Sequence, residues 1–142
     1  MDCDPAFADT AAFCERYDVD PADSANTILV ASKRPPGEFA VCVALATTRL
    51  DVNKAVRDAL EWRKLSFAPA DVTLDVTAME IGGVTPFGLP DGLPVLVDSA
   101  VMKRGEIVLG GGNRTSKLRL APDELLRIPG LRVIDGLANP VG

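Results

Sequence analysis

Short apolar runs separated by turns and amphipathic stretches fill the first half of the chain. The runs over residues 26–32 and 39–46 are rich in β-branched residues, and the turn-forming segment between them predicts a β-hairpin. The second run is apolar throughout, which is typical of a strand buried on both faces. Residues 51–60 carry apolar side chains at helical spacing, so they predict a helix that Asp51 caps.

Short helices and strands are also predicted on either side of this region. Asp4 as the N-cap and Pro5 at the first helical position predict a helix over residues 4–17. The other predicted elements are helices over residues 69–79 and 122–128 and strands over 65–67, 93–98, 106–111, 117–120 and 131–135. Because no regular βαβ alternation appears, the pattern predicts a single α+β domain. Its mixed, mostly antiparallel sheet is flanked by short helices.

The composition fits one globular domain with a real core, since 47% of the 142 residues are hydrophobic and 25% are charged. No apolar run approaches the ~18 residues that a membrane span needs. The acidic amino terminus lacks the basic region of a secretory signal, so we expect a cytoplasmic protein without membrane contact. The three cysteines fit no metal-ligand spacing, and the chain has no histidine. Both facts argue against a zinc site.

Charge is distributed unevenly along the chain. The net charge of −5 argues against non-specific binding to nucleic acid, but seven acidic residues and one basic residue lie within residues 1–25. Residues 103–119 hold five basic residues and one acidic residue. This second segment is either a local positive face or a set of scattered, solvated charges.

Two glycine-rich segments are the first candidates for chemistry, namely "IGGVTPFG" (81–88) and "LGGGNR" (109–114). Glycine lets backbone amides approach a ligand, and successive amides can hold an anion or an oxyanion. Neither segment has the spacing of a phosphate-binding loop or a dinucleotide fingerprint, so each segment taken alone is more typical of a structural turn. Without histidine no Ser-His or Cys-His arrangement exists, and Cys14 and Cys42 fit core positions. Any catalysis would rest on backbone amides, a lysine or arginine, and the substrate's own groups.

The order of five motifs makes a family resemblance specific. These are "NTILVAS", "TTRLDVNKAVRDAL", "RKLSFAPADVTLDVTAMEIGGVTPFGLP", "LPVLVDSAVM" and "VLGGGNRTSKLRLAPDELL". Over about residues 9–138 the chain resembles the YbaK/EbsC family of free-standing prolyl-tRNA editing domains. The resemblance implies one editing-type domain over residues 1–142 with a strongly bent, largely antiparallel sheet, and a family element before it that this chain lacks. It also implies hydrolysis of mischarged aminoacyl-tRNA of the prolyl editing type, with no metal or other cofactor.

The resemblance implies a pocket in which the two glycine segments face one another, with Asn26 at its rim. Catalytic positions would be Asn26, Gly82, Gly83 and Thr85. Substrate-binding positions would be Thr27, Pro86, Asp98, Gly110, Gly111 and Gly112, although Asp98 also fits a plain strand-end turn. Candidates for contact with the tRNA backbone are Lys54, Arg57, Arg114 and Lys117.

Two positions within the pocket depart from the family pattern. Asn26 stands where the resemblance implies a functional lysine, and Gly110 stands where it implies a small hydroxyl residue. Asparagine lacks the cation but keeps a hydrogen-bond donor and acceptor. The leading hypothesis is therefore a trans-acting aminoacyl-tRNA deacylase whose partner is the acceptor end of tRNA. The alternatives are a module of the same fold that binds tRNA or an aminoacyl ligand without hydrolysis, and a purely structural partner protein; a homodimer stays open.

Overall fold

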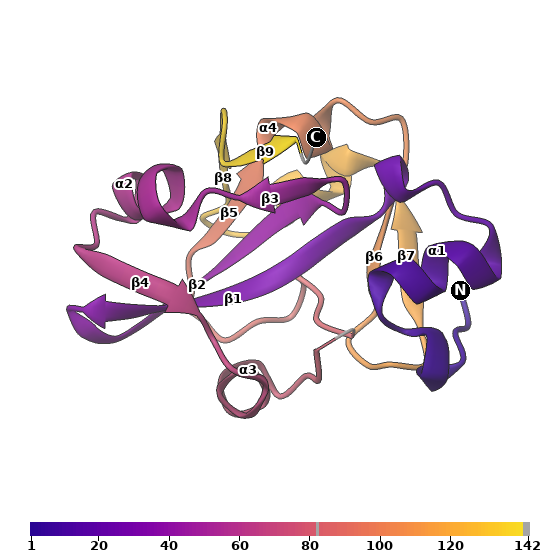
Figure 1. Ribbon diagram of the computed structural model, residues 1–142, viewed down its shortest axis with the longest axis horizontal. Coiled ribbons are helices and arrows are strands. Elements are labelled where there is room, and N and C mark those ends of the chain that lie inside the picture. Colours follow the sequence, from indigo (N-terminus) through magenta and orange to yellow (C-terminus); the bar gives the residue numbers. More distant parts are fainter. Residues whose placement is uncertain (82, 141–142) are drawn as a thin grey trace.

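A long β-hairpin forms the centre of the fold (Figure 1). The computed structural model describes residues 1–81 and 83–140. In it, β1 (Ala25–Arg34) and β2 (Pro36–Leu45) run antiparallel, with Thr27 opposite Val43. The hairpin predicted from the two apolar runs is thus confirmed. The turn is shorter than the predicted turn segment, because only one residue separates the end of β1 from the start of β2.

Three further strands complete a five-stranded sheet in the order β4-β1-β2-β5-β8. β4 pairs with β1 in the antiparallel sense, whereas β5 pairs in parallel with both β2 and β8. The three strands are β4 (Lys64–Phe67), β5 (Val95–Asp98) and β8 (Arg132–Ile134). The segment predicted at residues 131–135 therefore forms the edge strand of this sheet.

Two smaller antiparallel pairs flank the sheet. One joins β3 (Thr48–Leu50) to β9 (Ala138–Pro140), and the other joins β6 (Ile107–Gly110) to β7 (Lys117–Leu120). Antiparallel pairings thus outnumber parallel ones in the described part of the chain. The predicted α+β class with a mixed, mostly antiparallel sheet is confirmed.

The helices are short and lie in the connections. The α-helices are α1 (Thr10–Tyr17), α2 (Arg57–Leu60), α3 (Ala70–Thr77) and α4 (Ser99–Met102). The other turns are 3-10 helices at Pro5–Phe7, Pro21–Asp23 and Pro122–Arg127 and a π-helix at Val52–Val56.

Two helix predictions need correction in detail. The helix expected over residues 4–17 is divided into a 3-10 turn and α1, because Asp4 caps the 3-10 turn by accepting from the Ala6 amide. The helix expected over residues 51–60 begins as a π-helix and only then becomes α2. Asp51 makes no capping hydrogen bond within the described structure, so its expected role as a cap is wrong.

The main core lies on both faces of β2, as its continuous apolar sequence predicts. Val41 and Val43 pack on one face among residues of β5 and β6. Ala40 and Cys42 pack on the other face, toward β3, the π-helix and Trp62. Burial raises the pKa of the Cys42 thiol to about 12, so the thiol is inert at neutral pH, as expected of a core residue.

A separate small core joins the amino-terminal segment to the β6–β7 hairpin. Phe13 and Cys14 of α1 are buried here beside Cys3, Ala8 and Val108. Figure 1 places α1, β6 and β7 together at one end of the molecule's long axis, and α2 and β4 at the other. The start of the chain therefore packs on a hairpin more than 100 residues later in the sequence.

Candidate functional site

A half-open cavity of about 260 Å³ lies between β1, β6 and the first glycine segment. Its polar lining comes from Asp9, Ser24, Asn26, Thr27 and Lys117. Its other lining residues are Ala25, Ile28, Ile81, Val84, Val108, Leu109 and Gly110. Five separate stretches of the described chain thus supply one small site with an apolar wall and a polar wall.

The pairing of β1 explains why a cavity forms at this place. β4 begins to pair with β1 only at Val30, so it does not cover the first half of that strand. β6 approaches there instead, through a bridge between Ser24 and Val108. The β6–β7 hairpin forms its own two-stranded sheet and does not continue the main one, which leaves space beside residues 26–28.

The two glycine segments pack directly against one another. The Gly112 amide donates to the Gly83 carbonyl at 2.8 Å. A Cβ atom at Gly83 would collide with the Asn113 backbone, and one at Gly110 would collide with the carbonyl of Val84. These glycines therefore serve backbone-to-backbone contact, and the residues that line the cavity from these segments are Ile81, Val84, Leu109 and Gly110.

A tight turn after the second glycine segment returns the chain to the cavity. The Asn113 side-chain oxygen accepts hydrogen bonds from the Thr115 amide, the Thr115 hydroxyl and the Ser116 hydroxyl, at 2.9, 2.7 and 3.0 Å. Such Asx contacts favour a compact turn over extended chain. The turn brings Lys117 opposite Gly110 in the β6–β7 ladder, and thus to the cavity.

Four of the residues expected at the site line this cavity, namely Asn26, Thr27, Gly110 and Lys117. The Thr27 hydroxyl oxygen is buried and has no hydrogen-bond partner among the described residues. A buried hydroxyl without a partner costs about 1–3 kcal/mol, so a ligand that bonded to it would recover this free energy.

Lys117 needs a correction, because it was expected on the surface as a contact for the tRNA backbone. Only 6% of the residue is exposed. Its ammonium donates to the Ala8 carbonyl at 2.6 Å and lies 5.2 Å from the centre of the Phe13 ring. The residue therefore belongs to the cavity wall, because the amino-terminal segment covers it.

Arg114 was also expected to contact tRNA, and it instead joins three parts of the chain. Its guanidinium donates to the Asp9 carboxylate at 3.0 Å, the Ile81 carbonyl at 2.7 Å and the Pro5 carbonyl at 2.9 Å. These contacts hold the amino-terminal segment against the first glycine segment. The guanidinium is thus already bonded to protein acceptors, which argues against a contact with tRNA. The expected role of Arg114 in tRNA binding stays a prediction.

The other expected residues do not line the cavity. Thr85 is buried, and Pro86 lines a different hollow. Gly112 makes the hydrogen bond to Gly83, and Gly111 packs against Ser116. Gly82 lies outside the described residues.

The remaining expected residues lie in other elements. Lys54 and Arg57 are exposed on the π-helix and α2, at the opposite end of the molecule from β6 and β7 (Figure 1). Neither residue lines the cavity, and their expected contact with the tRNA backbone stays a prediction.

Asp98, expected to bind substrate, is instead a structural acid. It is 2% exposed at the end of β5. Burial raises the pKa of its carboxyl, while hydrogen bonds from the backbone amides of Ala138, Leu137 and Ser99 lower it and the nearby Asp135 raises it. The carboxylate thus ties the end of β5 to the segment that leads into β9. Its expected contact with the substrate stays a prediction that this burial opposes.

Sequence reasoning missed most of the apolar wall and one acidic residue. The missed lining residues are Asp9, Ser24, Ala25, Ile28, Ile81, Val108 and Leu109. Ile81 flanks the glycines that drew attention, so its place beside them was the available signal. No local pattern marks Asp9, because its position depends on packing between the two ends of the chain.

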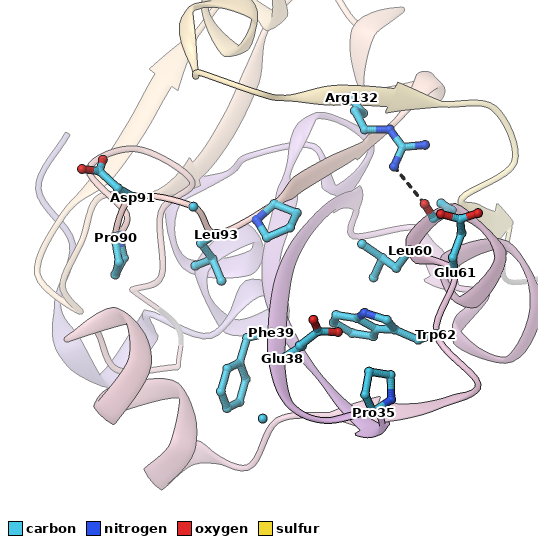
Figure 2. A pocket seen from close by; sticks show the side chains of 14 residues that line it. Pro35, Glu38, Phe39, Leu60, Glu61, Trp62, Pro90, Asp91, Leu93 and Arg132 are labelled. Atoms are coloured by element: carbon cyan, nitrogen blue, oxygen red, sulfur yellow. Dashed lines mark hydrogen bonds between the residues drawn. The ribbon is translucent and has the colours of Figure 1, made fainter.

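A larger hollow of about 820 Å³ lies elsewhere and shares no lining residue with the cavity. Figure 2 shows Pro35, Leu60 and Trp62 on one side of it and Pro90 and Leu93 on the other. Its acidic lining residues are Glu38, Glu61 and Asp91, and its lining residue Arg132 already donates to the Ala59 carbonyl at 2.8 Å. Three carboxylates oppose a phosphate-bearing ligand there, so the small cavity is the better candidate for a nucleic-acid end.

Among the described residues, no group of three or more histidine, cysteine or acidic side chains comes together in a way that could hold a metal ion. No helix in the same part of the chain is long and apolar enough to cross a membrane.

Comparison with known proteins gives a consistent result. The family model of the aminoacyl-tRNA editing domain matches residues 4–128. The uncharacterized protein YwhH of Bacillus subtilis (strain 168) is 34% identical over 83 residues, which are 58% of this chain and 52% of that protein. The chain thus matches about half the length of this curated relative.

Two solved structures share the fold at low sequence identity. The crystal structure of hypothetical protein APE2540 has a TM-score of 0.82 and 23% identity, covering 93% of this chain and 85% of that one. The crystal structure of a proposed trans-editing enzyme for prolyl tRNA synthetase has a TM-score of 0.81 and 19% identity, covering 95% and 83%. At these identities the likeness concerns the fold alone.

Proposed function

The chain belongs to the aminoacyl-tRNA editing domain family, and from this premise we propose that it is a trans-acting deacylase of mischarged aminoacyl-tRNA. The observation that carries the proposal is the half-open cavity that gathers Asn26, Thr27, Gly110 and Lys117. A further proposal is the prolyl editing type, supported by the fold shared with a proposed trans-editing enzyme for prolyl tRNA synthetase. Such a protein would work in the cytoplasm on the acceptor end of tRNA.

The size of the cavity suits the acyl end of such a substrate. Its volume of about 260 Å³ lies just below the range of about 300–1,000 Å³ that holds drug-sized ligands. An amino-acid-sized group fits such a space, whereas a folded tRNA must stay outside. The apolar side chains of Ile81, Val84 and Leu109 would contact the amino-acid side chain, and the polar wall would contact the ester.

The reaction needs no oxidant and no group other than water. The oxygen of a water molecule attacks the acyl carbon, and the electron pair of the carbonyl double bond moves to its oxygen. The electron pair on the oxyanion then re-forms the carbonyl double bond as the bond between the acyl carbon and the ribose oxygen breaks. The ribose oxygen takes a proton that the water supplied. The protein's contribution is to hold the ester and to stabilise the negative charge that develops on the acyl oxygen.

A second candidate function is binding without hydrolysis, and Asn26 is the observation that favours it. The position carries an amide, whereas the resemblance to the editing family implies a lysine there. An amide can hold a carbonyl or a water by hydrogen bonds but supplies no charge. In this alternative the cavity would bind an aminoacyl end and release it unchanged.

A deacylation screen tests the proposal and separates the two candidates. Purified protein is incubated with tRNAs that carry matched and mismatched amino acids, and the half-life of each ester in buffer alone is the baseline. We expect faster hydrolysis of at least one ester in which the tRNA for proline carries another amino acid. A panel in which every ester decays at its baseline rate, although the protein binds the tRNAs, would support the binding module instead.

A further inference from the structure

A positively charged side chain lines the cavity. Among the described residues that line it, Lys117 is the only lysine or arginine. Lysine is seldom buried, because its ammonium loses hydration on leaving water, yet this residue is 6% exposed. The position of this charge beside a candidate substrate cavity is the feature from which the inference starts.

Several contacts fix the position of Lys117. Its main chain pairs with Met1, whose amino group donates to the Lys117 carbonyl at 2.8 Å and whose carbonyl accepts from the Lys117 amide at 2.9 Å. The ammonium donates to the Ala8 carbonyl at 2.6 Å and lies by the Phe13 ring. A charge held in this way needs little reorganisation when a substrate arrives, which favours electrostatic catalysis.

The surroundings also weaken the hydration of this ammonium. Burial lowers the pKa of Lys117, and the neighbouring Arg114 lowers it further, whereas Cys3, Asp9 and Cys14 raise it. A poorly hydrated charge in a region of low dielectric acts more strongly on a nearby negative charge than a surface lysine does.

We propose that Lys117 is a catalytic residue whose ammonium donates a hydrogen bond to the acyl oxygen of the bound ester and stabilises the oxyanion. The inference rests on the proposed deacylase function. In this inference the positive charge at the cavity comes from Lys117 of β7. The cavity residue Asn26 of β1 is an uncharged amide and cannot supply it. The Thr27 hydroxyl, buried without a partner among the described residues, would be a second donor to the same ester.

A purely structural role for Lys117 is the alternative. Its bond to Ala8 could serve only to hold the amino-terminal segment. Tyr17→Phe offers a matched control, because the Tyr17 hydroxyl accepts from the Asp4 amide at 2.7 Å and also holds this segment. Tyr17 does not line the cavity, so this variant loosens the segment and leaves the cation in place.

The experiment measures kcat and KM of wild type, Lys117→Met, Lys117→Arg and Tyr17→Phe on a mischarged tRNA that wild type hydrolyses. We expect Lys117→Met to lower kcat by about ten- to a hundred-fold, the worth of one charge-assisted hydrogen bond. KM should change little, and Lys117→Arg should keep part of the rate. Tyr17→Phe should keep the wild-type kcat, although its melting temperature falls.

The pH profile gives a readout that a structural role would not change. Only the protonated ammonium can donate, so the rate above buffer hydrolysis should fall as pH rises through the lowered pKa of Lys117. In Lys117→Arg the fall should be absent, because arginine stays protonated. If Lys117→Met does not fold, the comparison of wild type with Lys117→Arg still decides the matter.

The outcomes that overturn the inference are distinct from failure of the proposed function. A wild-type protein that hydrolyses none of the esters overturns both. Active wild type with an equally active, folded Lys117→Met variant overturns the role of Lys117 alone. A loss confined to KM that shrinks as salt rises would assign the ammonium to a phosphate. Equal pH profiles for lysine and arginine would assign it to structure, and either result contradicts the inference.

Discussion

The carbonyl of Gly83 accepts a hydrogen bond of 2.8 Å from the amide of Gly112. This bond joins the two glycine segments, whose sequences suggest a role in binding a ligand. The backbones meet so closely that neither Gly83 nor Gly110 leaves space for a side chain. The glycines of this site thus build the wall of the cavity by packing against each other, and the neighbouring residues form its surface.

Replacing Gly110 should therefore lower both stability and activity. The new methyl group of Gly110→Ala would meet the Val84 carbonyl and the Gly83 backbone, and such overpacking costs about 1–3 kcal/mol. Gly105→Ala is the matched control, because no atom lies within 4 Å of the position its methyl group would take. Urea unfolding measures both variants. Equal midpoints for the two would show that the contact between the segments can relax.

Arg114 should act as a structural residue. Arg114→Ala removes hydrogen bonds to Asp9, Ile81 and Pro5, and bonds that involve a charged group are worth about 1.5–3 kcal/mol each when they are well formed. We expect a loss of more than about 1 kcal/mol and faster amide exchange over residues 1–9. Arg119→Ala is the comparison, since its pair with Glu106 is exposed and is worth about 0–1 kcal/mol.

A different result would restore the original assignment of Arg114 to tRNA. In that case Arg114→Ala would keep the wild-type unfolding midpoint and exchange rates, and its affinity for tRNA would fall. Filter binding of tRNA at two salt concentrations measures that affinity.

The stability of the protein should depend on pH through Asp98. Its pKa is raised above the ordinary value of 3.8, mainly by burial. At pH values between the ordinary pKa and the raised pKa, the folded state binds more protons than the unfolded state. The free energy of unfolding therefore falls as pH rises through this range. Asp98→Asn removes this titration. We expect the stability of wild type relative to Asp98→Asn to increase as pH is lowered from neutral toward the ordinary value, which urea unfolding over a pH series measures; a constant difference would contradict the raised pKa.

Moving the cation from one strand to the other tests whether charge or position matters. Asn26 and Lys117 line the same cavity, so in Asn26→Lys two ammonium groups would oppose each other's protonation. We expect the single variant Asn26→Lys to be no faster than wild type. In the Lys117→Met background the same change should recover part of the lost rate, up to about ten-fold.

The measurement for this pair is single-turnover deacylation, with melting temperatures to exclude unfolding. A double variant as slow as Lys117→Met would mean that the charge acts only from β7. A single variant Asn26→Lys that is much faster than wild type would mean that the cavity lacks a functional cation, contrary to the role proposed for Lys117.

Much of the fold could be predicted from local sequence patterns. The apolar run of β2 indicated burial on both faces, and both of its core clusters are observed. The expected hairpin and the strands β4 to β8 follow from alternation and turn residues. Asn26 and Thr27 were expected at the site, and they line the cavity. These features depend on residues close together in the sequence.

The position of Lys117 could not be predicted in this way. In a strand, Lys117 and Arg119 point to the same side, and their sequence suggests one solvated basic face. Arg119 is exposed, whereas Lys117 is covered by the amino-terminal segment. Burial here depends on packing between the two ends of the chain, for which neither the strand pattern nor the charge count carries a signal.

The bond between the Lys117 ammonium and the Ala8 carbonyl also has a consequence for the order of assembly, because 109 positions separate the two residues. The β1–β2 hairpin can close as soon as its own residues are available. The cavity is complete only when residue 117 has returned to the start of the chain, and such long closures are slow. A chain still emerging from the ribosome would therefore hold its β1–β2 hairpin before its cation, and it would gain the completed site only near the end of synthesis.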